Sequence, residues 1–246
     1  MMTIVHISDT HGLHRNVSVP WGDVLVHSGD FTNRGEKYQV EDFIDWLVNQ
    51  PHRYKVFIAG NHDICFDEHH PLNENKLEKH LMGEHYSPMK PSWLSNLLEN
   101  LPDNVFYLEN DGCEIESVKF WGSPVTPWFY GEHWVFNKKH HEIKPTWDKI
   151  PLGTDVVITH GPVQYKCDYV SHSQHFAGCA QLAFKILEVK PLLHLCGHIH
   201  QGYGWAYSSD TEYFNGSILN ESYEVAHAPW EIEINPDYRE VNVLNK

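Results

Sequence analysis

The sequence predicts an α/β fold in which two β-sheets pack together and helices cover them. Five short apolar runs each end in a polar, glycine-containing turn, and stretches with helical spacing lie between them. The middle and the C-terminal part of the chain add further β-segments and turns. Alternation of strands and helices beside β-rich regions is typical of sheets that carry helices on their outer faces.

The five apolar runs have the length and composition of buried strands. They are short, rich in β-branched residues and bounded by turn-forming residues, which favours strands over helices. In chain order they are residues 3–12, 23–30, 54–63, 155–162 and 192–200. Residues 105–123 add β-segments joined by turns, and residues 203–220 and 230–244 add strands near the C-terminus.

Two stretches between these runs repeat apolar residues at intervals of three or four, which predicts amphipathic helices. The apolar face of residues 38–50 consists of Val40, Phe43, Ile44 and Leu47, and that of residues 179–189 consists of Leu182 and Ile186 with Leu187 or Val189. Pro51 and Pro191 follow the two stretches and supply the stops.

We expect residues 1–246 to form a single domain, because the chain shows no internal repeat, low-complexity tract or linker. Its apolar fraction of 41% is that of a globular protein. The polar stretch 67–101 is predicted to be a surface insertion that contains a helix. The sequence predicts no particular oligomeric state.

Charge and cysteine content exclude several classes of protein. A net charge of −15 disfavours binding to extended nucleic acid or to an anionic membrane, since both attract surplus Lys and Arg. The five cysteines are odd in number and contain no C-x-x-C pair, which favours a reducing compartment over a disulfide framework or a zinc ribbon. The chain has no signal-peptide pattern and no membrane-spanning apolar run, so we expect a cytoplasmic protein without a membrane partner.

Possible metal ligands stand at the end of each of the five predicted strands. They are Asp9 and His11, Asp30, Asn61 and His62, His160, and His198 and His200. A single His-x-His pair carries little information, because 20 histidines in 246 residues produce about one or two such pairs by chance. Five strand ends in succession are different, because the carboxyl ends of neighbouring strands converge in space.

The spacing within these motifs leads to further expectations. Asp-x-His and His-x-His would place both side chains on one face of an extended segment, with Ile199 pointing the opposite way into the core. His6, His27 and His194 lie inside the predicted strands and are expected to pack in the core or to support the ligands. His14 is expected at the surface.

The types of ligand indicate transition metals. Imidazole, carboxylate and amide oxygen together suit Mn, Fe, Zn, Ni or Co, whereas Mg and Ca prefer oxygen ligands alone. Seven ligands are too many for one tetrahedral ion but suit two divalent ions that share a bridging carboxylate. Two metals about 3.5–4 Å apart favour attack of a metal-bound hydroxide on phosphorus, so a phosphoester is the expected substrate.

The motifs Gly29-Asp30, Gly60-Asn-His-Asp63 and Gly197-His-Ile-His200 occur in a fixed order with Asp9-Thr-His11 and Thr159-His-Gly161. In this order they resemble the calcineurin-like metallophosphoesterase superfamily. Longer segments from Ile4 to Gly204 resemble its MPPED branch, whose relatives include class III cyclic-nucleotide phosphodiesterases. The resemblance implies the four-layer metallophosphoesterase fold, a two-sheet β-sandwich flanked by helices, with a dinuclear site on its loop edge.

The resemblance also implies roles for individual residues, with Mn or Fe as the favoured metals. Asp9, His11 and His200 would hold the first metal, Asn61, His160 and His198 the second, and Asp30 would bridge both. His62 would contact phosphate and protonate the leaving oxygen, as a third catalytic residue with Asp30 and Asn61. Arg34, Asn61 and His62 would bind substrate.

One position departs from part of the superfamily. Its Ser/Thr phosphatases carry aspartate where Asn33 stands, so the carboxylate partner of their catalytic histidine is missing here. Asp63 follows His62 directly but is expected to point away from it.

We therefore expect hydrolysis of small phosphodiesters such as cyclic nucleotides by a metal-bridging hydroxide. The alternatives are a phosphomonoesterase or phosphoprotein phosphatase using the same site, and a weakly active nucleotide-binding metalloprotein that acts as a sensor or scaffold.

Three of the aromatic residues in 120–129, which are Trp121, Trp128 and Phe129, have two possible roles. Packing in the core or in a cleft is the more common role of such side chains. Stacking on a nucleobase is the alternative.

Overall fold

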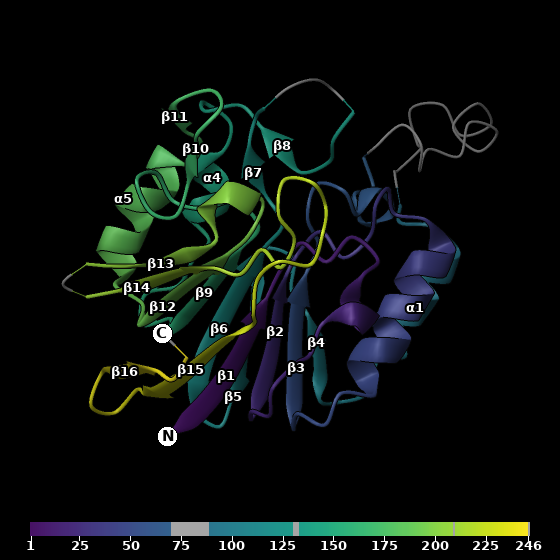
Figure 1. Cartoon of the computed structure of the whole chain (residues 1–246), viewed down its shortest axis with the longest axis horizontal. Coiled ribbons are helices and arrows are strands. Elements are labelled where there is room, and N and C mark those ends of the chain that lie inside the picture. Colours follow the sequence, from purple (N-terminus) through teal and green to yellow (C-terminus); the bar gives the residue numbers. More distant parts are fainter. Residues whose placement is uncertain (70–88, 130–132, 209, 246) are drawn as a thin grey trace.

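Two mixed six-stranded sheets lie face to face in the computed structural model, which describes residues 1–69, 89–129, 133–208 and 210–245 (Figure 1). The first sheet has the order β16-β15-β1-β2-β3-β4, and the second has the order β13-β14-β12-β9-β6-β5. This arrangement confirms the predicted fold class.

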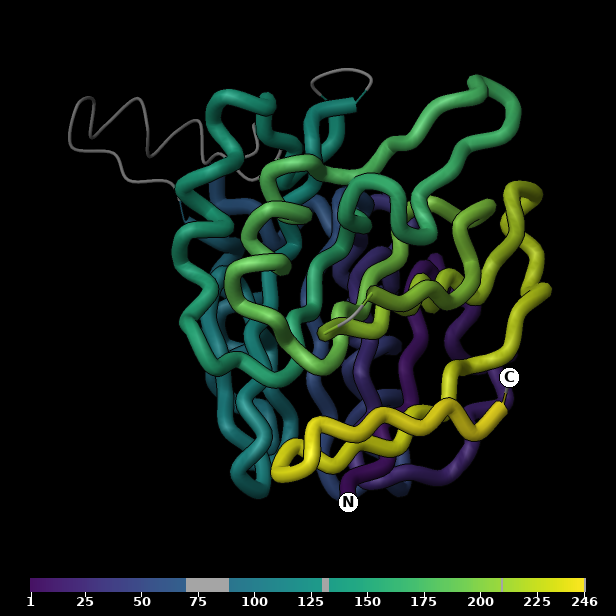
Figure 2. The backbone as a smooth tube through the Cα atoms, turned by 90° about the vertical axis from the view of Figure 1, so that its left-hand side faces the viewer, coloured from purple at the N-terminus to yellow at the C-terminus, as the bar shows by residue number. Residues whose placement is uncertain are grey.

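In the first sheet β1, β2, β3 and β4 run parallel, and the C-terminal hairpin β15–β16 adds to β1 in antiparallel fashion. Figure 2 shows this hairpin in yellow crossing the N-terminal strand in purple. The bounds are β1 Met2–Ile7, β2 Val24–Ser28, β3 Tyr54–Ile58, β4 Val105–Tyr107, β15 Trp230–Asn235 and β16 Glu240–Val243.

In the second sheet β6, β9, β12 and β14 run parallel, and β5 and β13 are antiparallel edge strands. The bounds are β5 Asp111–Ile115, β6 Val118–Ser123, β9 Val156–Thr159, β12 Leu193–Cys196, β13 Gly204–Tyr207 and β14 Glu212–Asn215. Two short pairs lie outside the sheets, β7 Thr126–Pro127 with β8 Asn137–Lys138, and β10 Tyr169–Val170 with β11 His175–Phe176.

Side chains that point alternately to the two faces of each sheet divide the core into layers. In β1, Ile4 faces the second sheet, whereas Val5 faces the opposite way. In β9, Val156 and Ile158 face the first sheet and Val157 faces outward. Because successive side chains of a strand point to opposite faces, each sheet contributes to a shared central core and to an outer one.

Helices cover both outer cores, which completes four layers. The bounds are α1 Lys37–Val48, α3 Ser92–Glu99, α4 Lys144–Trp147 and α5 Ala180–Val189. α1 and α3 pack on the first sheet, and α4 and α5 pack on the second. The predicted apolar face of α1 is buried in full, and α5 buries Val189 while Leu187 is exposed.

The region predicted as an insertion, 67–101, is described only in part, because residues 70–88 lie outside the described residues. Its last part contains α3, whose Leu94 is fully buried against α1 and the first sheet. In the described parts of the chain, none of the helices combines the length and the apolar character that a membrane crossing requires.

Replacing Phe43 by alanine is expected to lower the free energy of unfolding by about 3–5 kcal/mol, the cost of removing a fully buried phenyl ring. Phe43 stacks on Phe31 with ring centroids 4.1 Å apart and holds α1 on the first sheet. Urea denaturation measures the change. The control is Phe184→Ala on the exposed face of α5, which is expected to change the value by less than about 0.5 kcal/mol. Equal changes in the free energy of unfolding for the two variants would contradict the role of Phe43 in the core.

Candidate metal centre

The predicted ligands converge at one loop edge of the sandwich. Candidate donor atoms within 4.8 Å of one another form three clusters among the described residues. They are Asp9 with His11 and His200, Asp30 with His160 and His198, and His11 with Asp30 and His62. The first two clusters correspond to the predicted halves of a dinuclear site, and the third joins them through Asp30 and His11.

These side chains do not lie on extended segments, so that part of the prediction is wrong. The strands end before the ligands, at Ile7 in β1 and at Cys196 in β12. Asp9, Asp30 and His198 have φ values of 53°, 56° and 68°, in the left-handed region. Such strained conformations concentrate at functional sites, where the surrounding structure must hold them in place.

Two glycines of the motifs leave room for the carboxylates. A Cβ atom at Gly197 would collide with Ser8 Oγ and the carboxylate of Asp9. A Cβ atom at Gly60 would collide with Asp30, and it would lie 2.7 Å from Cε1 of His160. The glycines therefore allow the backbones of separate strands to approach the same pair of carboxylates.

The imidazole rings are oriented as metal-binding histidines usually are. Nδ1 of His11, His160 and His200 lies 3.2, 2.9 and 2.9 Å from the carbonyl oxygens of Thr32, Ser28 and Asn220. A carbonyl only accepts, so each Nδ1 donates a proton, which leaves Nε2 as the ring atom that can bind a metal. Nε2 of His11 is buried and has no hydrogen-bond partner in the structure, although buried polar atoms normally have one. The donor set therefore fits metal ions.

Asp30 lies at the centre of the site. Its Oδ2 is 3.1 Å from Nε2 of His160 and 4.0 Å from Nε2 of His11. Burial raises the pKa of the Asp30 carboxyl, but the combined effect of His160, His62 and His11 outweighs it and the pKa falls below its usual range. Burial lowers the pKa of His160, but Asp30, with Asp9 and the Ser28 carbonyl, outweighs it and raises the value to about 9. Asp30 is therefore an anion that attracts cations.

Asn61 and Asp9 are the remaining candidate ligands of the two halves of the metal site. Oδ1 of Asn61 is 3.0 Å from Nε2 of His160, so an amide oxygen faces the second cluster. The Asp9 carboxylate accepts from the backbone N–H of His198 at 2.9 Å and from Ser217 Oγ at 3.0 Å. Its other oxygen lies 3.5 Å from Nε2 of His200. Asp9 thus links the β12 loop to the first cluster.

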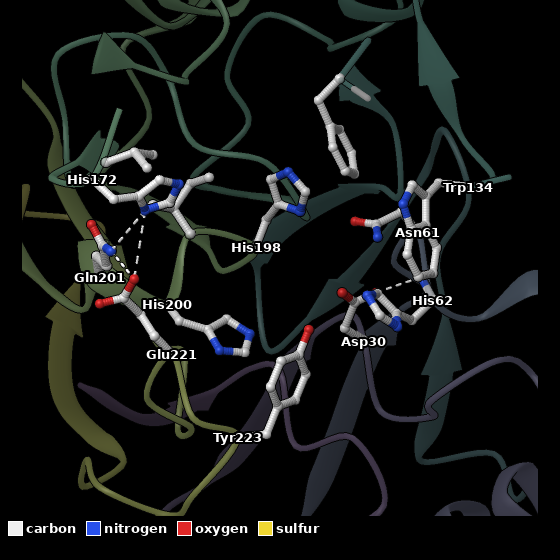
Figure 3. A pocket seen from close by; sticks show the side chains of 13 residues that line it. Asp30, Asn61, His62, Trp134, His172, His198, His200, Gln201, Glu221 and Tyr223 are labelled. Atoms are coloured by element: carbon white, nitrogen blue, oxygen red, sulfur yellow. Dashed lines mark hydrogen bonds and ion pairs between the residues drawn. The ribbon is translucent and has the colours of Figure 1, made fainter. Parts of the chain in front are cut away.

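His62 lies at the edge of the clusters and has partners on three sides. Its backbone N–H donates to Asp30 Oδ1 at 2.8 Å, and its Nδ1 lies 2.8 Å from the carbonyl oxygen of Asn33. The ring centroid is 4.1 Å from that of Trp134 (Figure 3). The Arg34 guanidinium lies 5.8 Å from the Trp134 centroid. Asn33 therefore orients His62 through its backbone and not through its side chain.

Asp63 points away from the pocket, as expected, and its carboxylate holds the loops together. It accepts from the backbone N–H groups of Asp30, Thr32 and Gly60 and from the Thr32 hydroxyl, at 2.7–2.9 Å. Burial raises its pKa to about 7. Asp63 thereby fixes the β2 and β3 loops relative to each other.

The other strand histidines support the neighbouring loops. His6, His27 and His194 are fully buried, and their Nε2 atoms lie 2.8–3.0 Å from the hydroxyls of Ser28, Thr10 and Thr159. Burial lowers the pKa of all three to about 3, so they are neutral. His14 is also fully buried and bonds to Asp42, so the expectation of a surface position is wrong.

A pocket of about 320 Å³ opens over the clusters. Its described lining includes the expected Asp30, Asn61, His62, His198 and His200, but not Arg34. Ile199 lines the pocket and does not point into the core, which corrects the expectation for that residue. Of the three aromatic residues considered above, Phe129 lines the pocket, Trp128 is 49% exposed and Trp121 is buried.

Besides Val170, the sequence reasoning missed five lining residues, which are Trp134, His172, Gln201, Glu221 and Tyr223. The last four lie on one side of the pocket and Trp134 on the other (Figure 3). Tyr223 contacts the rings of His11 and His200 edge-on. Among the five, only Gln201 adjoins a motif. An exposed polar or aromatic residue in a loop carries no periodicity, so no local signal marks it.

The four-layer fold and its paired histidine–aspartate clusters are features of a class of metal-dependent hydrolases. A family model described as calcineurin-like phosphoesterase matches residues 2–202. Human metallophosphoesterase domain-containing protein 1 is 36% identical over 232 residues, which cover 94% of this chain and 70% of the human protein. The chain therefore belongs to the calcineurin-like metallophosphoesterase family, and the predicted resemblance is confirmed.

Solved structures show the same fold at low sequence identity. Phosphopantetheinyl hydrolase from Mycobacterium tuberculosis matches with a TM-score of 0.58 and 14% identity, over 90% of each chain. The protein TT1561 of Thermus thermophilus matches with a TM-score of 0.59 and 12% identity, over 99% of this chain and 98% of the other.

Proposed function

We propose that this protein is a dinuclear metal-dependent phosphoesterase that hydrolyses small phosphodiesters, with cyclic nucleotides among the candidate substrates. The observation that carries the proposal is the convergence of two histidine–aspartate clusters on Asp30, beside a histidine that is not needed to complete either cluster. Family membership supports the phosphoester class of substrate. The central core, to which both sheets contribute, supports a single domain.

The residues would hold the two ions in the predicted way. Asp9, His11 and His200 would bind one ion, Asn61, His160 and His198 the other, and Asp30 both. When bound, a pair of divalent transition-metal ions supplies a nucleophile at neutral pH and stabilises charge on the phosphoryl oxygens. The imidazole-rich donor set supports transition metals over Mg or Ca.

His62 would bind the phosphate and donate a proton to the leaving oxygen. Its Nδ1 is directed to the Asn33 carbonyl, so Nε2 is the atom available to the substrate. An alkoxide leaves poorly unless it is protonated, and histidine holds a proton near neutral pH. Trp134 packs against the ring and limits its rotation.

Charge in the pocket supports diesters over monoesters. A phosphomonoester carries up to two negative charges near neutral pH, whereas a diester carries one. The described residues that line the pocket include no Lys or Arg, and they include the carboxylate of Glu221. The described side chains of the pocket therefore add no cation to that of the metal ions for the second charge of a monoester. Its size fits a small molecule.

Arg34 would act on substrate only if it moved, because it lies outside the described pocket lining. Its guanidinium lies over the ring of Trp134, and this side chain separates Arg34 from the pocket. We propose that Arg34 extends past Trp134 to a phosphate oxygen when substrate binds, since guanidinium groups bind such oxygens in pairs of hydrogen bonds.

Removal of metal and a panel of substrates test the proposed function. Protein stripped with a chelator is expected to lose hydrolysis of bis-p-nitrophenyl phosphate and to regain it with two equivalents of Mn²⁺ or Fe²⁺ per chain. The value of kcat/KM is expected to be higher for this diester than for p-nitrophenyl phosphate. Parallel assays with 2′,3′- and 3′,5′-cyclic nucleotides would identify the preferred diester.

Two outcomes would contradict this proposal. A higher kcat/KM for the monoester would indicate a phosphomonoesterase or phosphoprotein phosphatase. Stoichiometric nucleotide binding by the metal-loaded protein, without turnover of any ester, would indicate a sensor or scaffold.

A further inference from the structure

A second cavity, of about 410 Å³, adjoins the pocket over the metal centre. The two share Phe129, Val170, His198 and Ile199, so they meet at a candidate metal ligand. The second cavity lies between the loop after β7, the β10–β11 hairpin and the loop after β12, and these segments gather at the upper end of Figure 1. A phosphate held beside His198 would therefore have a cavity on either side.

We infer that, when an open-chain phosphodiester binds, the second cavity binds the ester group that stays on phosphorus, and that it favours an uncharged aromatic group. This inference rests on the proposed function. Hydrolysis breaks the bond between phosphorus and the leaving oxygen, which takes a proton from His62, and forms a new bond to the oxygen of water, whose released proton replaces the one that His62 gave up. The other ester bond stays intact. His62 lines the first pocket and not the second, so the leaving group must lie in the first.

The lining of the second cavity sets the chemistry of its ligand. Its described residues include no Asp, Glu, Lys or Arg, and its ionisable side chains are His140, His175 and His198, so a second charged group would find no permanently charged counter-ion there. They include the aromatic rings of Trp128, Phe129 and Phe176. Aromatic rings that line a cavity next to phosphate are suited to stacking on a planar group.

The rings are held in place although they are partly exposed. Phe176 is 46% exposed, yet its ring contacts those of Tyr165 and Tyr169 at centroid distances of 4.9 and 5.2 Å. Phe129 lies 4.6 Å from the His198 ring. A stacking surface that is already ordered loses little conformational entropy when a ligand binds.

Binding of two phosphodiesters that differ only in their ester groups tests the inference without requiring turnover. Calorimetric titration of the Mn²⁺-loaded protein is expected to show diphenyl phosphate binding about 10-fold more tightly than dimethyl phosphate. Phe176→Ala is expected to reduce this ratio by about threefold or more. The matched control, Phe184→Ala, removes an exposed ring of α5 and is expected to leave the ratio unchanged.

Kinetics with two substrates that share one leaving group then show which cavity binds the aromatic ester group. Phenyl p-nitrophenyl phosphate is expected to have a kcat/KM about 10-fold above that of methyl p-nitrophenyl phosphate, again in a Phe176-dependent way. Equal binding of the two diesters, or a phenyl preference that survives Phe176→Ala and disappears in Trp134→Ala, would overturn the inference. Phe176-dependent binding of diphenyl phosphate without turnover of either substrate would support the cavity assignment and overturn only the proposed hydrolysis.

Discussion

Asp30→Asn is expected to lower kcat/KM for bis-p-nitrophenyl phosphate by about 10²-fold or more, the scale on which loss of one electrostatic stabiliser slows an enzyme. The substitution keeps the shape of the side chain but removes the negative charge that faces both His160 and His11. Without that charge, two cations at adjacent positions would repel each other with less compensation. Elemental analysis is therefore expected to find fewer than two metal ions per chain.

The matched control is Asp45→Asn, which makes the same change on the exposed side of α1. It is expected to keep both metal ions and full activity. Circular dichroism should show that the Asp30 variant remains folded, so that a loss of activity reflects the site. Normal turnover with two bound metal ions in Asp30→Asn would exclude Asp30 as a bridging ligand.

His62→Ala is expected to lower kcat by about 10²–10⁴-fold on diesters with an alkoxide leaving group, the usual contribution of a general acid. The loss is expected to be smaller with p-nitrophenolate, because this anion leaves readily without a proton. Rates with methyl p-nitrophenyl phosphate and with a cyclic nucleotide give the comparison. The dependence on leaving group separates proton donation from simple binding of phosphate.

Metal content decides between two roles of His62, because the ring also lies in a cluster with His11 and Asp30. If His62 donates a proton, its alanine variant keeps two metal ions per chain. Loss of one ion would make it a ligand and contradict the proposed role. His141→Ala, which removes an exposed histidine outside the described pocket lining, is the control for loss of an imidazole.

Local sequence was sufficient to predict the fold class and the candidate ligands. The runs that became β1, β2, β3, β9 and β12 were visible as short apolar segments, because a strand buried on both faces needs apolar residues throughout. The faces of α1 and α5 followed from helical periodicity. The ligand positions followed from the order of motifs at strand ends, because parallel strands bring their carboxyl ends to one edge.

The conformation of those strand ends depended on contacts between distant segments. Asp9 and Asp30 adopt left-handed φ values because their loops are held by groups far away in sequence, such as Ser217 and Asp63. His14 is buried because Asp42 on α1 satisfies its ring nitrogen. In the sequence, none of these three partners lies near the residue that it holds.

The pocket likewise depends on tertiary structure. Trp134 and Tyr223 reach the histidines from loops that are separated from the motifs by tens of residues. His198 and Ile199 stand between two cavities only because the β10–β11 hairpin and the β7 loop fold over the same edge. Metal ligation needs a few residue types at strand ends, which local sequence can encode. The shape of a cavity depends on which distant loops meet there, and this is set by the packing of the whole sandwich.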